Sequence, residues 1–459
     1  MFVESAVGSI LPAANLNARG AGWKPTSQGP EVILKHRAFS KDSMEHPPSA
    51  AQPSLQEFVD KAIERLRRRP SPLASLEYFY RRAGQILRPP LVTKARAQGR
   101  KVIGYYCALV PVEVIASFDA VPLRLCSGLP VISRHGLPRD CCPVVSSSTE
   151  FINGGEETSS PAIDGVVVPT VCDWKSHFAE TLSDRLPTLT FQISAKKREP
   201  SARRERLRSL TRLVHFMEEV TGRKLSRRDL WQAIRMYQRG SHATRKLSEL
   251  MRADPPPFRG SELILVMNVS FFDDIASWTD AVMQLVGEAS RSKARREVSA
   301  KGAPRLLLTG APIIWPNWNV PEVLEESGGS IVAEELCSGV RVFYDPVRID
   351  EPTLDDMLQA LAERYSLACT CPCFVPNEDR VYRNVSLARR YAVDGVIYHN
   401  LRTCYLYQSE ASVLRSAFQE LAIPFLEVET DSSREEREQL AVRIEPFIEM
   451  LRGKGHRGG

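Results

Sequence analysis

Cysteine is the residue type in this sequence whose spacing most strongly suggests chemistry. The chain has 10 cysteines, and three of them are concentrated in the run Cys369-Thr-Cys371-Pro-Cys373. Neither an apolar strand nor one face of a helix needs three thiols at this spacing. The run therefore indicates metal ligation. Its spacing matches neither a zinc finger nor a ferredoxin, so it does not identify the metal.

Four other cysteines lie at places suited to metal ligands. Cys142 is followed by Pro143 and a group of serines, a pattern that holds a thiolate on a rigid, non-helical backbone. Cys107, Cys172 and Cys404 each come shortly after an apolar run of the kind that forms a buried strand. Packing as a small apolar side chain is the competing interpretation for each, because cysteine is among the most buried residue types.

Three cysteines are better explained by packing. Cys126 and Cys337 each end a strand-like segment in a repeated Leu-Cys-Ser-Gly string, and Cys141 directly precedes Cys142, so its side chain should point elsewhere. We do not expect a disulfide framework, because the N-terminus has no features of an export signal and cytosolic thiols are kept reduced.

The apolar runs predict a duplicated α/β architecture that would position these cysteines. Each copy has a strand, a helix that begins near a proline, a second strand, and a third strand that leads to a cysteine. The matched segments are 101–107 with 305–309, the helices that open at Pro111 and Pro321, 120–125 with 330–333, and 164–172 with 394–404.

This architecture makes a geometric prediction about the cysteines. Open parallel sheets bind ligands outside the carboxyl ends of their strands, where loops and helix N-termini converge. Cys107, Cys172 and Cys404 should therefore lie at such an edge. Ala311 stands where the second copy pairs with Cys107, so the two lobes should not contribute ligands equally.

We expect four parts along the chain. Residues 1–75 are rich in Pro, Ser, Ala and Gly without a helical or strand period, which predicts a flexible extension. Residues 76–199 should form an N-terminal α/β lobe, 200–299 a helical insert, and 300–455 a C-terminal α/β lobe. Within the insert, Ser226 and Asp229 resemble a capping box at the start of a helix.

Composition excludes several classes of protein. The 459 residues, 43% hydrophobic and 25% charged, are typical of a globular chain with more than one domain. The net charge of +6 comes largely from arginine runs that solvated helix faces explain, so we do not expect nucleic-acid binding. The sequence has neither a long apolar stretch nor a signal-peptide pattern, which predicts a cytoplasmic protein without membrane contact.

Several strings in succession resemble the 2-hydroxyacyl-CoA dehydratase and benzoyl-CoA reductase family, and in particular the D-component of 2-hydroxyglutaryl-CoA dehydratase. The resemblance covers about residues 76 to 455. It is carried by Gly104-Tyr-Tyr-Cys-Ala-Leu-Val-Pro-Val-Glu-Val-Ile115, Cys142-Pro143, Val166-Val-Val-Pro-Thr-Val-Cys172-Asp173, Thr221-Gly-Arg-Lys-Leu-Ser226, Glu334-Glu-Leu-Cys-Ser-Gly-Val-Arg341, and Asp394-Gly-Val-Ile397 through Cys404.

The resemblance implies a fold, a cofactor and partners. The fold would be two duplicated Rossmann- or flavodoxin-like lobes with a helical insert, holding a [4Fe–4S] cluster in the inter-lobe cleft through Cys142, Cys172 and Cys404. The cluster would leave one iron open and perform one-electron, ketyl-radical chemistry on an acyl-CoA thioester. An ATP-dependent iron–sulfur activator would supply the electron. The chain would pair with itself or with a related subunit to complete the enzyme, a lyase or a reductase. The open iron would make this enzyme sensitive to oxygen.

Other residues are candidates beside this ligand set. Cys107 would lie near the cluster face, so it would support the cluster, add a ligand or simply pack. Glu113 is a candidate for moving a proton, although a solvated or helix N-terminal glutamate is the more common arrangement.

Two alternatives remain open. The additional Cys371 and Cys373 resemble a neighbouring branch, the double-cubane [8Fe–9S] cluster reductases of small molecules. The third hypothesis is a metal-free two-lobed binding protein in which the cysteines only pack.

Overall fold

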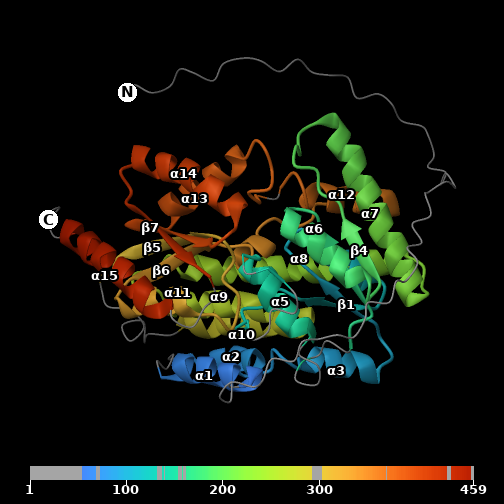
Figure 1. Cartoon of the computed structure of the whole chain (residues 1–459), viewed down its shortest axis with the longest axis horizontal. Coiled ribbons are helices and arrows are strands. Elements are labelled where there is room, and N and C mark those ends of the chain that lie inside the picture. Colours follow the sequence, from blue (N-terminus) through green and yellow to red (C-terminus); the bar gives the residue numbers. More distant parts are fainter. Residues whose placement is uncertain are drawn as a thin grey trace. The chain divides into compact units, whose positions relative to one another are not determined.

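Two parallel sheets of four strands carry the chain's architecture (Figure 1). The computed structural model describes residues 54–68, 73–131, 137–138, 140–153, 158, 162–291, 302–368, 370–431 and 436–455. The strands are β1 (Val102–Tyr105), β2 (Val121–Arg124), β3 (Gly165–Pro169), β4 (Thr188–Phe191), β5 (Arg305–Gly310), β6 (Ser330–Glu335), β7 (Gly395–Leu401) and β8 (Phe425–Thr430).

The two sheets have the same topology, which confirms the predicted duplicated α/β fold. Their strand orders are β2-β1-β3-β4 and β6-β5-β7-β8, and every pair within them is parallel. Parallel neighbours need a crossover connection. Helix α4 (Val112–Ser117) provides it between β1 and β2, and α11 (Asn319–Glu326) provides it between β5 and β6.

The central strands are continuous apolar runs, as expected for parallel strands covered on both faces. All residues of β1, β3 and β7 are buried. The edge strands β4 and β8 are largely half-buried, with polar residues such as Thr188 and Glu427. This polar character explains why sequence patterns did not mark these two segments as strands.

Four helices follow the first sheet. They are α7 (Pro200–Thr221), α8 (Arg227–Leu250), α9 (Gly260–Val269) and α10 (Ile275–Arg291). Ser226 caps α8 as predicted, because its side chain accepts a hydrogen bond from the Asp229 backbone N–H at 3.1 Å.

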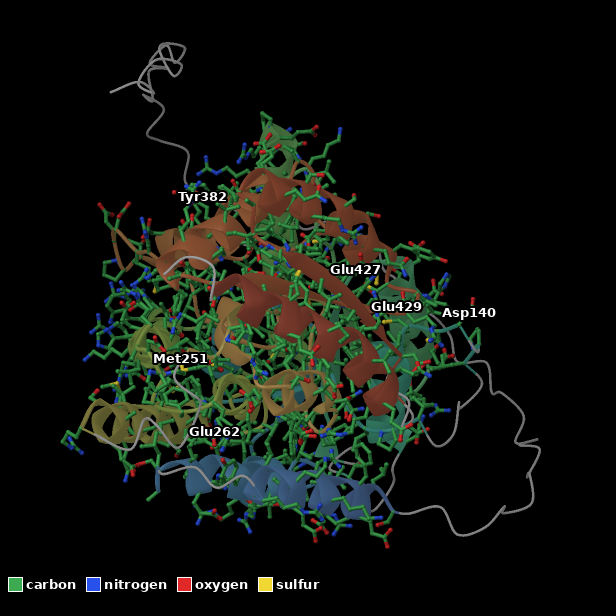
Figure 2. All side chains as sticks on the ribbon, turned by 90° about the vertical axis from the view of Figure 1, so that its left-hand side faces the viewer. Asp140, Met251, Glu262, Tyr382, Glu427 and Glu429 are labelled. Atoms are coloured by element: carbon green, nitrogen blue, oxygen red, sulfur yellow. The ribbon has the colours of Figure 1, made fainter. Side chains whose placement is uncertain are left out.

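These helices join both lobes. Helix α8 packs on α4 and on α12 (Leu354–Arg364), while α9 packs on β6. A Cβ at Gly260 would lie 2.3 Å from the Ile331 carbonyl oxygen, so only glycine permits this approach of α9 to β6. Glu262 of α9, labelled in Figure 2, is buried and accepts a hydrogen bond of 2.7 Å from Tyr80.

The expected flexible extension through residue 75 is wrong for its last part. Residues Leu55–Arg67 form helix α1, which buries Val59 and Leu66 and is capped by Ser54. It lies against α2 (Leu76–Gly84), which in turn packs on α9, and α3 (Pro90–Ala97) follows (Figure 1). Residues 1–53 and 69–72 lie outside the described residues.

The remaining helices are α5 (Pro143–Asn153), α6 (Asp173–Ser183), α13 (Glu378–Arg390), α14 (Tyr405–Glu420) and α15 (Glu436–Gly455). None of the helices within the described ranges combines the length and apolar character that crossing a membrane requires.

The loops after β2 and β5 meet between the two lobes. The Gly128 backbone N–H donates to the Trp315 carbonyl at 3.1 Å. A Cβ at Gly128 would lie 1.9 Å from the Ile314 carbonyl oxygen, which only a glycine avoids. The carboxyl ends of both sheets thus contribute loops to a shared region.

Candidate functional site

Cys142, Cys172 and Cys404 share one structural position, the residue that begins a helix. Cys172 is the N-cap of α6 and Cys404 is the N-cap of α14. Cys142 directly precedes α5, and its carbonyl accepts from the Ser146 backbone N–H at 3.0 Å. All three are half-buried. A helix N-terminus presents free N–H groups and positive potential, which favour a thiolate or an anionic cluster.

The three thiols also influence one another, which places them in one neighbourhood. Burial, together with the charges of Cys404 and Cys172, raises the pKa of Cys142 to about 12, while N–H groups of Val145 and Val144 oppose the increase. Burial likewise raises the pKa of Cys404 to about 11, with Cys172 among the contributors. Metal-free, these two thiols are protonated at neutral pH, so ligation would release their protons.

The spacing of these thiols differs from that of a mononuclear metal site. Among the described residues, no three His, Cys, Asp or Glu side chains are gathered closely enough to hold a single metal ion. A cubane cluster makes a different demand, because each of its thiolates binds a separate iron. The three half-buried thiols come from both lobes and are soft donors of the type that iron–sulfur clusters take.

A second group of thiols consists of Cys107, Cys337 and Cys371, which also interact electrostatically. Cys107 follows β1 in a left-handed backbone conformation with φ of 71°, which is uncommon for a side chain-bearing residue. Burial raises the pKa of the Cys107 thiol. Cys107 belongs to the N-terminal lobe, whereas Cys337 and Cys371 belong to the C-terminal lobe. The second group, like the first, therefore spans both lobes.

Neighbouring groups lower the pKa of the C-terminal-lobe members of this second group. A hydrogen bond from the Cys373 thiol lowers the pKa of Cys371, and burial opposes this effect. Burial also disfavours the Cys337 thiolate, but Arg341 and Arg124 lower the pKa of Cys337 below its ordinary value. Cys373 therefore supports Cys371. Cys369 lies outside the described residues.

Three cations accompany the thiols. Lys175, in the first turn of α6, interacts with cysteines of both groups, including Cys107, Cys172 and Cys337. The proximity of these thiols raises the pKa of Lys175 although burial opposes it. Together with Arg124 and Arg341, Lys175 compensates negative charge that thiolates or a bound cluster would bring.

Arg341 also belongs to a buried ion network that connects the three cysteine-bearing loops of the C-terminal lobe. Its guanidinium lies 3.4 Å from Glu335 and donates to the Tyr407 hydroxyl at 2.9 Å. Arg380, fully buried, pairs with both Glu335 and Glu410. The Thr370 hydroxyl donates to Glu335 at 3.0 Å. The network fixes the loops of Cys337, Cys371 and Cys404 relative to one another.

Glu113 is not the solvated carboxylate that is most common in a first helical turn. It is 4% exposed, and its Oε2 accepts a hydrogen bond of 2.7 Å from the Tyr365 hydroxyl. Burial raises the pKa of Glu113, while Arg364 and Tyr365 oppose the increase. A carboxyl group in this environment can hold a proton closer to neutral pH than a solvated one.

The structure thus brings Cys142, Cys172 and Cys404 into one neighbourhood. Sequence reasoning did not identify Cys337 as a residue of the site, nor the cations Lys175, Arg124 and Arg341. The repeated Leu-Cys-Ser-Gly string held a signal for Cys337, because only its second copy is followed by an arginine two residues later.

Comparison with known proteins identifies relatives of the whole two-lobed region. The family model of 2-hydroxyglutaryl-CoA dehydratase, D-component, matches residues 107–451. A protein of Escherichia coli (strain K12) provisionally named as a dehydratase subunit, YjiM, is 30% identical over 375 residues, which cover 78% of this chain and 94% of that protein.

More distant relatives have assigned names. The (R)-2-hydroxyglutaryl-CoA dehydratase subunit beta of Acidaminococcus fermentans is 22% identical, covering 79% of this chain and 95% of that protein. The (R)-phenyllactyl-CoA dehydratase beta subunit of Clostridium sporogenes is also 22% identical, covering 77% of this chain and 92% of that protein.

Proposed function

Because this chain belongs to the 2-hydroxyglutaryl-CoA dehydratase D-component family, and so is an enzyme subunit of the dehydratase or reductase type, we propose that it holds a [4Fe–4S] cluster through Cys142, Cys172 and Cys404. The observation that carries this proposal is the shared position of the three thiols. Each begins a helix, each is half-buried, and together they come from both lobes.

When bound, such a cluster would supply one-electron, ketyl-radical chemistry on an acyl-CoA thioester. The chain's own residues would prepare the site for it. The N-termini of α5, α6 and α14 and the ammonium of Lys175 stabilise negative charge at the thiolates. Glu113, buried beside Tyr365, would hold a proton near Tyr105. Burial raises the pKa of Tyr105, and the charges of Cys126, Glu113 and Cys107 contribute to the increase.

The proposal includes partners. The named relatives are beta subunits of their enzymes, so a second, related subunit or another copy of this chain would complete the enzyme. An ATP-dependent iron–sulfur activator would deliver the electron, and an acyl-CoA would be the substrate. The cytoplasm, where thiols stay reduced, suits this chemistry.

The second thiol group favours one alternative function. Cys107, Cys337 and Cys371 would allow a second cubane, as in the double-cubane [8Fe–9S] reductases of small molecules. In that case both thiol groups would be ligand sets and Lys175 would lie near both. The two functions differ in the amount of iron that each chain binds.

Single alanine substitutions test the ligand set. Cys142→Ala, Cys172→Ala and Cys404→Ala should each abolish the visible absorption of the cluster and most of the bound iron in protein purified without oxygen. Full iron retention by any of them would remove that cysteine from the set. Under the single-cluster proposal, Cys107→Ala, Cys337→Ala and Cys371→Ala should keep about four irons per chain, whereas loss of half the iron in these variants would establish the double-cubane alternative.

A further inference from the structure

Asn400, near the carboxyl end of β7, has a buried amide without a hydrogen-bond partner. Its side chain is 0% exposed, and within the described part of the chain neither Nδ2 nor Oδ1 has a partner. Burial of an unpaired amide costs free energy, and an unpaired N–H is rarer in folded proteins than an unpaired carbonyl. The Nδ2 donor of Asn400 is therefore arranged for an acceptor that the chain does not provide.

A second buried asparagine shows how this fold treats an amide with a structural role. Asn268 of α9 is also 0% exposed. Its Nδ2 donates to the Ile264 carbonyl at 2.9 Å and to the Ser338 carbonyl at 3.0 Å, and its Oδ1 accepts from the Trp315 backbone N–H at 3.1 Å. Both polar atoms of this amide are thus satisfied, as is usual for buried polar groups, whereas those of Asn400 are not.

The position of Asn400 in the sheet places it at an open edge. Strand β5 ends at Gly310, which pairs with His399, so β5 has no residue opposite Asn400. On the other side, Asn400 pairs with Glu429 of the edge strand β8, which is labelled in Figure 2. Open parallel sheets bind their ligands outside this carboxyl edge.

Strand alternation determines the face of the sheet on which the Asn400 side chain lies. Successive side chains point to opposite faces, so Asn400 shares a face with Tyr398. The Tyr398 hydroxyl donates to the Tyr407 carbonyl of α14 at 2.7 Å. His399 lines a small cavity on the opposite face. Asn400 therefore faces α14, the helix that begins after Cys404.

A tight turn brings Cys404 back over this end of β7. The Cys404 backbone N–H donates to the Leu401 carbonyl at 3.0 Å, and Thr403 has a left-handed backbone conformation with φ of 67°. Burial raises the pKa of Tyr398, and the charge of Cys404 contributes to the increase, so the thiol lies close to that face of the strand. Asn400 is two residues nearer to the turn than Tyr398. Its amide is therefore a neighbour of the thiol.

We propose that Nδ2 of Asn400 donates a hydrogen bond to a sulfur atom of the cluster bound at Cys404 and thereby raises the reduction potential of that cluster. The inference rests on the proposed function, because it requires the cluster. Hydrogen bonds to the sulfur atoms of an iron–sulfur cluster stabilise its reduced, more negative state. An amide is not a soft ligand, so Asn400 would tune the cluster and not ligate an iron.

The midpoint potential of the cluster, measured by EPR-monitored redox titration of the full-length protein purified without oxygen, tests the proposal. Asn400→Leu nearly preserves the volume and removes the donor. This variant should keep its iron and shift the reduction equilibrium about tenfold towards the oxidised state, which is about 59 mV for one electron. Asn400→Ala, which cannot overpack the site, should shift the potential in the same direction.

The proposed hydrogen bond also has a spectroscopic signature. In the reduced cluster, a proton on Nδ2 of Asn400 should give a coupling in the ENDOR spectrum that disappears after exchange into heavy water. Asn400→Leu should lack this coupling before exchange as well. A residue that only supports the fold would change neither the coupling nor the potential.

Asn384→Leu is the matched control. Asn384 of α13 is also 0% exposed, and its Oδ1 has no partner among the described residues. Its Nδ2, however, donates to the Arg380 carbonyl at 2.9 Å, one turn earlier in the same helix. Because this N–H group is already engaged, Asn384→Leu should keep the potential and the ENDOR spectrum of the unmodified protein.

Iron analysis of the same preparations separates this inference from the proposed function. Unmodified protein without iron would refute both. Iron-loaded Asn400→Leu and Asn400→Ala with the potential and the coupling of the unmodified protein would overturn the inference alone and leave the cluster in place. Loss of iron from both variants would show that Asn400 is needed to assemble the cluster, which contradicts a role confined to its potential.

Discussion

At the scale of single residues, position distinguishes the cysteines. Cys142, Cys172 and Cys404 are half-buried at helix N-termini, whereas Cys126 is buried at 8% exposure within the apolar core that surrounds β2. A thiol that only packs needs no free N–H groups around it. A ligand does, because its negative charge must be compensated.

Cys126→Ala tests this distinction. The substitution removes a buried sulfur, so it should reduce the free energy of unfolding by roughly 1 kcal/mol or more and leave iron content unchanged. Chemical denaturation and iron analysis on the same sample provide the two readouts. A variant that folds but has lost its iron would show that Cys126 is a cluster ligand and not only a packing residue.

His399 provides a prediction about pH. Burial lowers the pKa of His399 from 6.5 to about 4. Its Nδ1 lies 3.0 Å from the Ala311 carbonyl, which can only accept, so Nδ1 carries the proton and Nε2 accepts from the Thr430 hydroxyl at 2.8 Å.

The unfolded chain takes up a proton at His399 near pH 6.5, while the folded chain does so only near pH 4. The stability associated with the neutral ring is therefore present above pH 6.5 and is lost as the pH falls towards 4, by about 3 kcal/mol. Urea unfolding should show that the unfolding free energy of the unmodified protein falls by about 3 kcal/mol relative to that of His399→Gln as the pH is lowered from 6.5 to 4. Parallel pH curves would contradict the neutral buried ring.

Sequence alone indicated the thiols at the ends of strands but not their surroundings. Arg124 and Cys337 meet only because the two lobes place the ends of β2 and β6 against each other, and such a contact leaves no local pattern. Lys175 had no distinguishing signal either, since a lysine in a first helical turn is normally solvated. Electrostatic contacts between the two lobes can therefore be recognised only once the fold is known.

At the scale of elements, continuous apolar runs and caps were the reliable signals. They identified β1, β5 and the start of α8, whose capping residue Ser226 is adjacent in sequence to the helix it begins. Helix α1 was missed because it was grouped with the Pro- and Ser-rich residues before it in one extension, although it has apolar residues at helical spacing: Leu55, Phe58, Val59, Ala62, Ile63 and Leu66. The apolar stripe of α1 is buried against α2, because a helix of this length depends on tertiary packing for its stability.

Deletion of α1 should therefore be costly. Removing residues 1–67 exposes the surface that Leu55, Val59 and Leu66 cover and breaks the 3.1 Å pair between Arg65 and Glu322. We expect a loss on the order of 5 kcal/mol in unfolding free energy, with a lower melting temperature. Removal of residues 1–53 is the reference, because it leaves α1 intact. Equal melting temperatures for the two truncations would show that α1 is dispensable.

At the scale of the whole molecule, both lobes border the candidate site. Each lobe contributes thiols to both groups, and the ion network around Arg380 fixes the C-terminal-lobe loops. Exposed aromatic side chains on the same lobe, such as Tyr382 in Figure 2, at 76%, and Tyr405, at 74%, remain uncovered by the described chain.

The relatives' names as beta subunits predict an assembly larger than a single chain. Size-exclusion chromatography with light scattering, performed without oxygen, should give a mass clearly above the 51.4 kDa of one chain when the partner or a second copy is present. A mass of one chain at all concentrations and with the co-expressed partner would contradict this expectation.

The amount of iron and acid-labile sulfide per chain in protein purified without oxygen, together with its EPR spectrum before and after reduction, tests whether the chain holds the proposed cluster. A [4Fe–4S] cluster on Cys142, Cys172 and Cys404 predicts about four of each and a signal that air exposure destroys. About eight irons would favour two cubanes on the two thiol groups. A chain without iron or sulfide would contradict the proposed cluster.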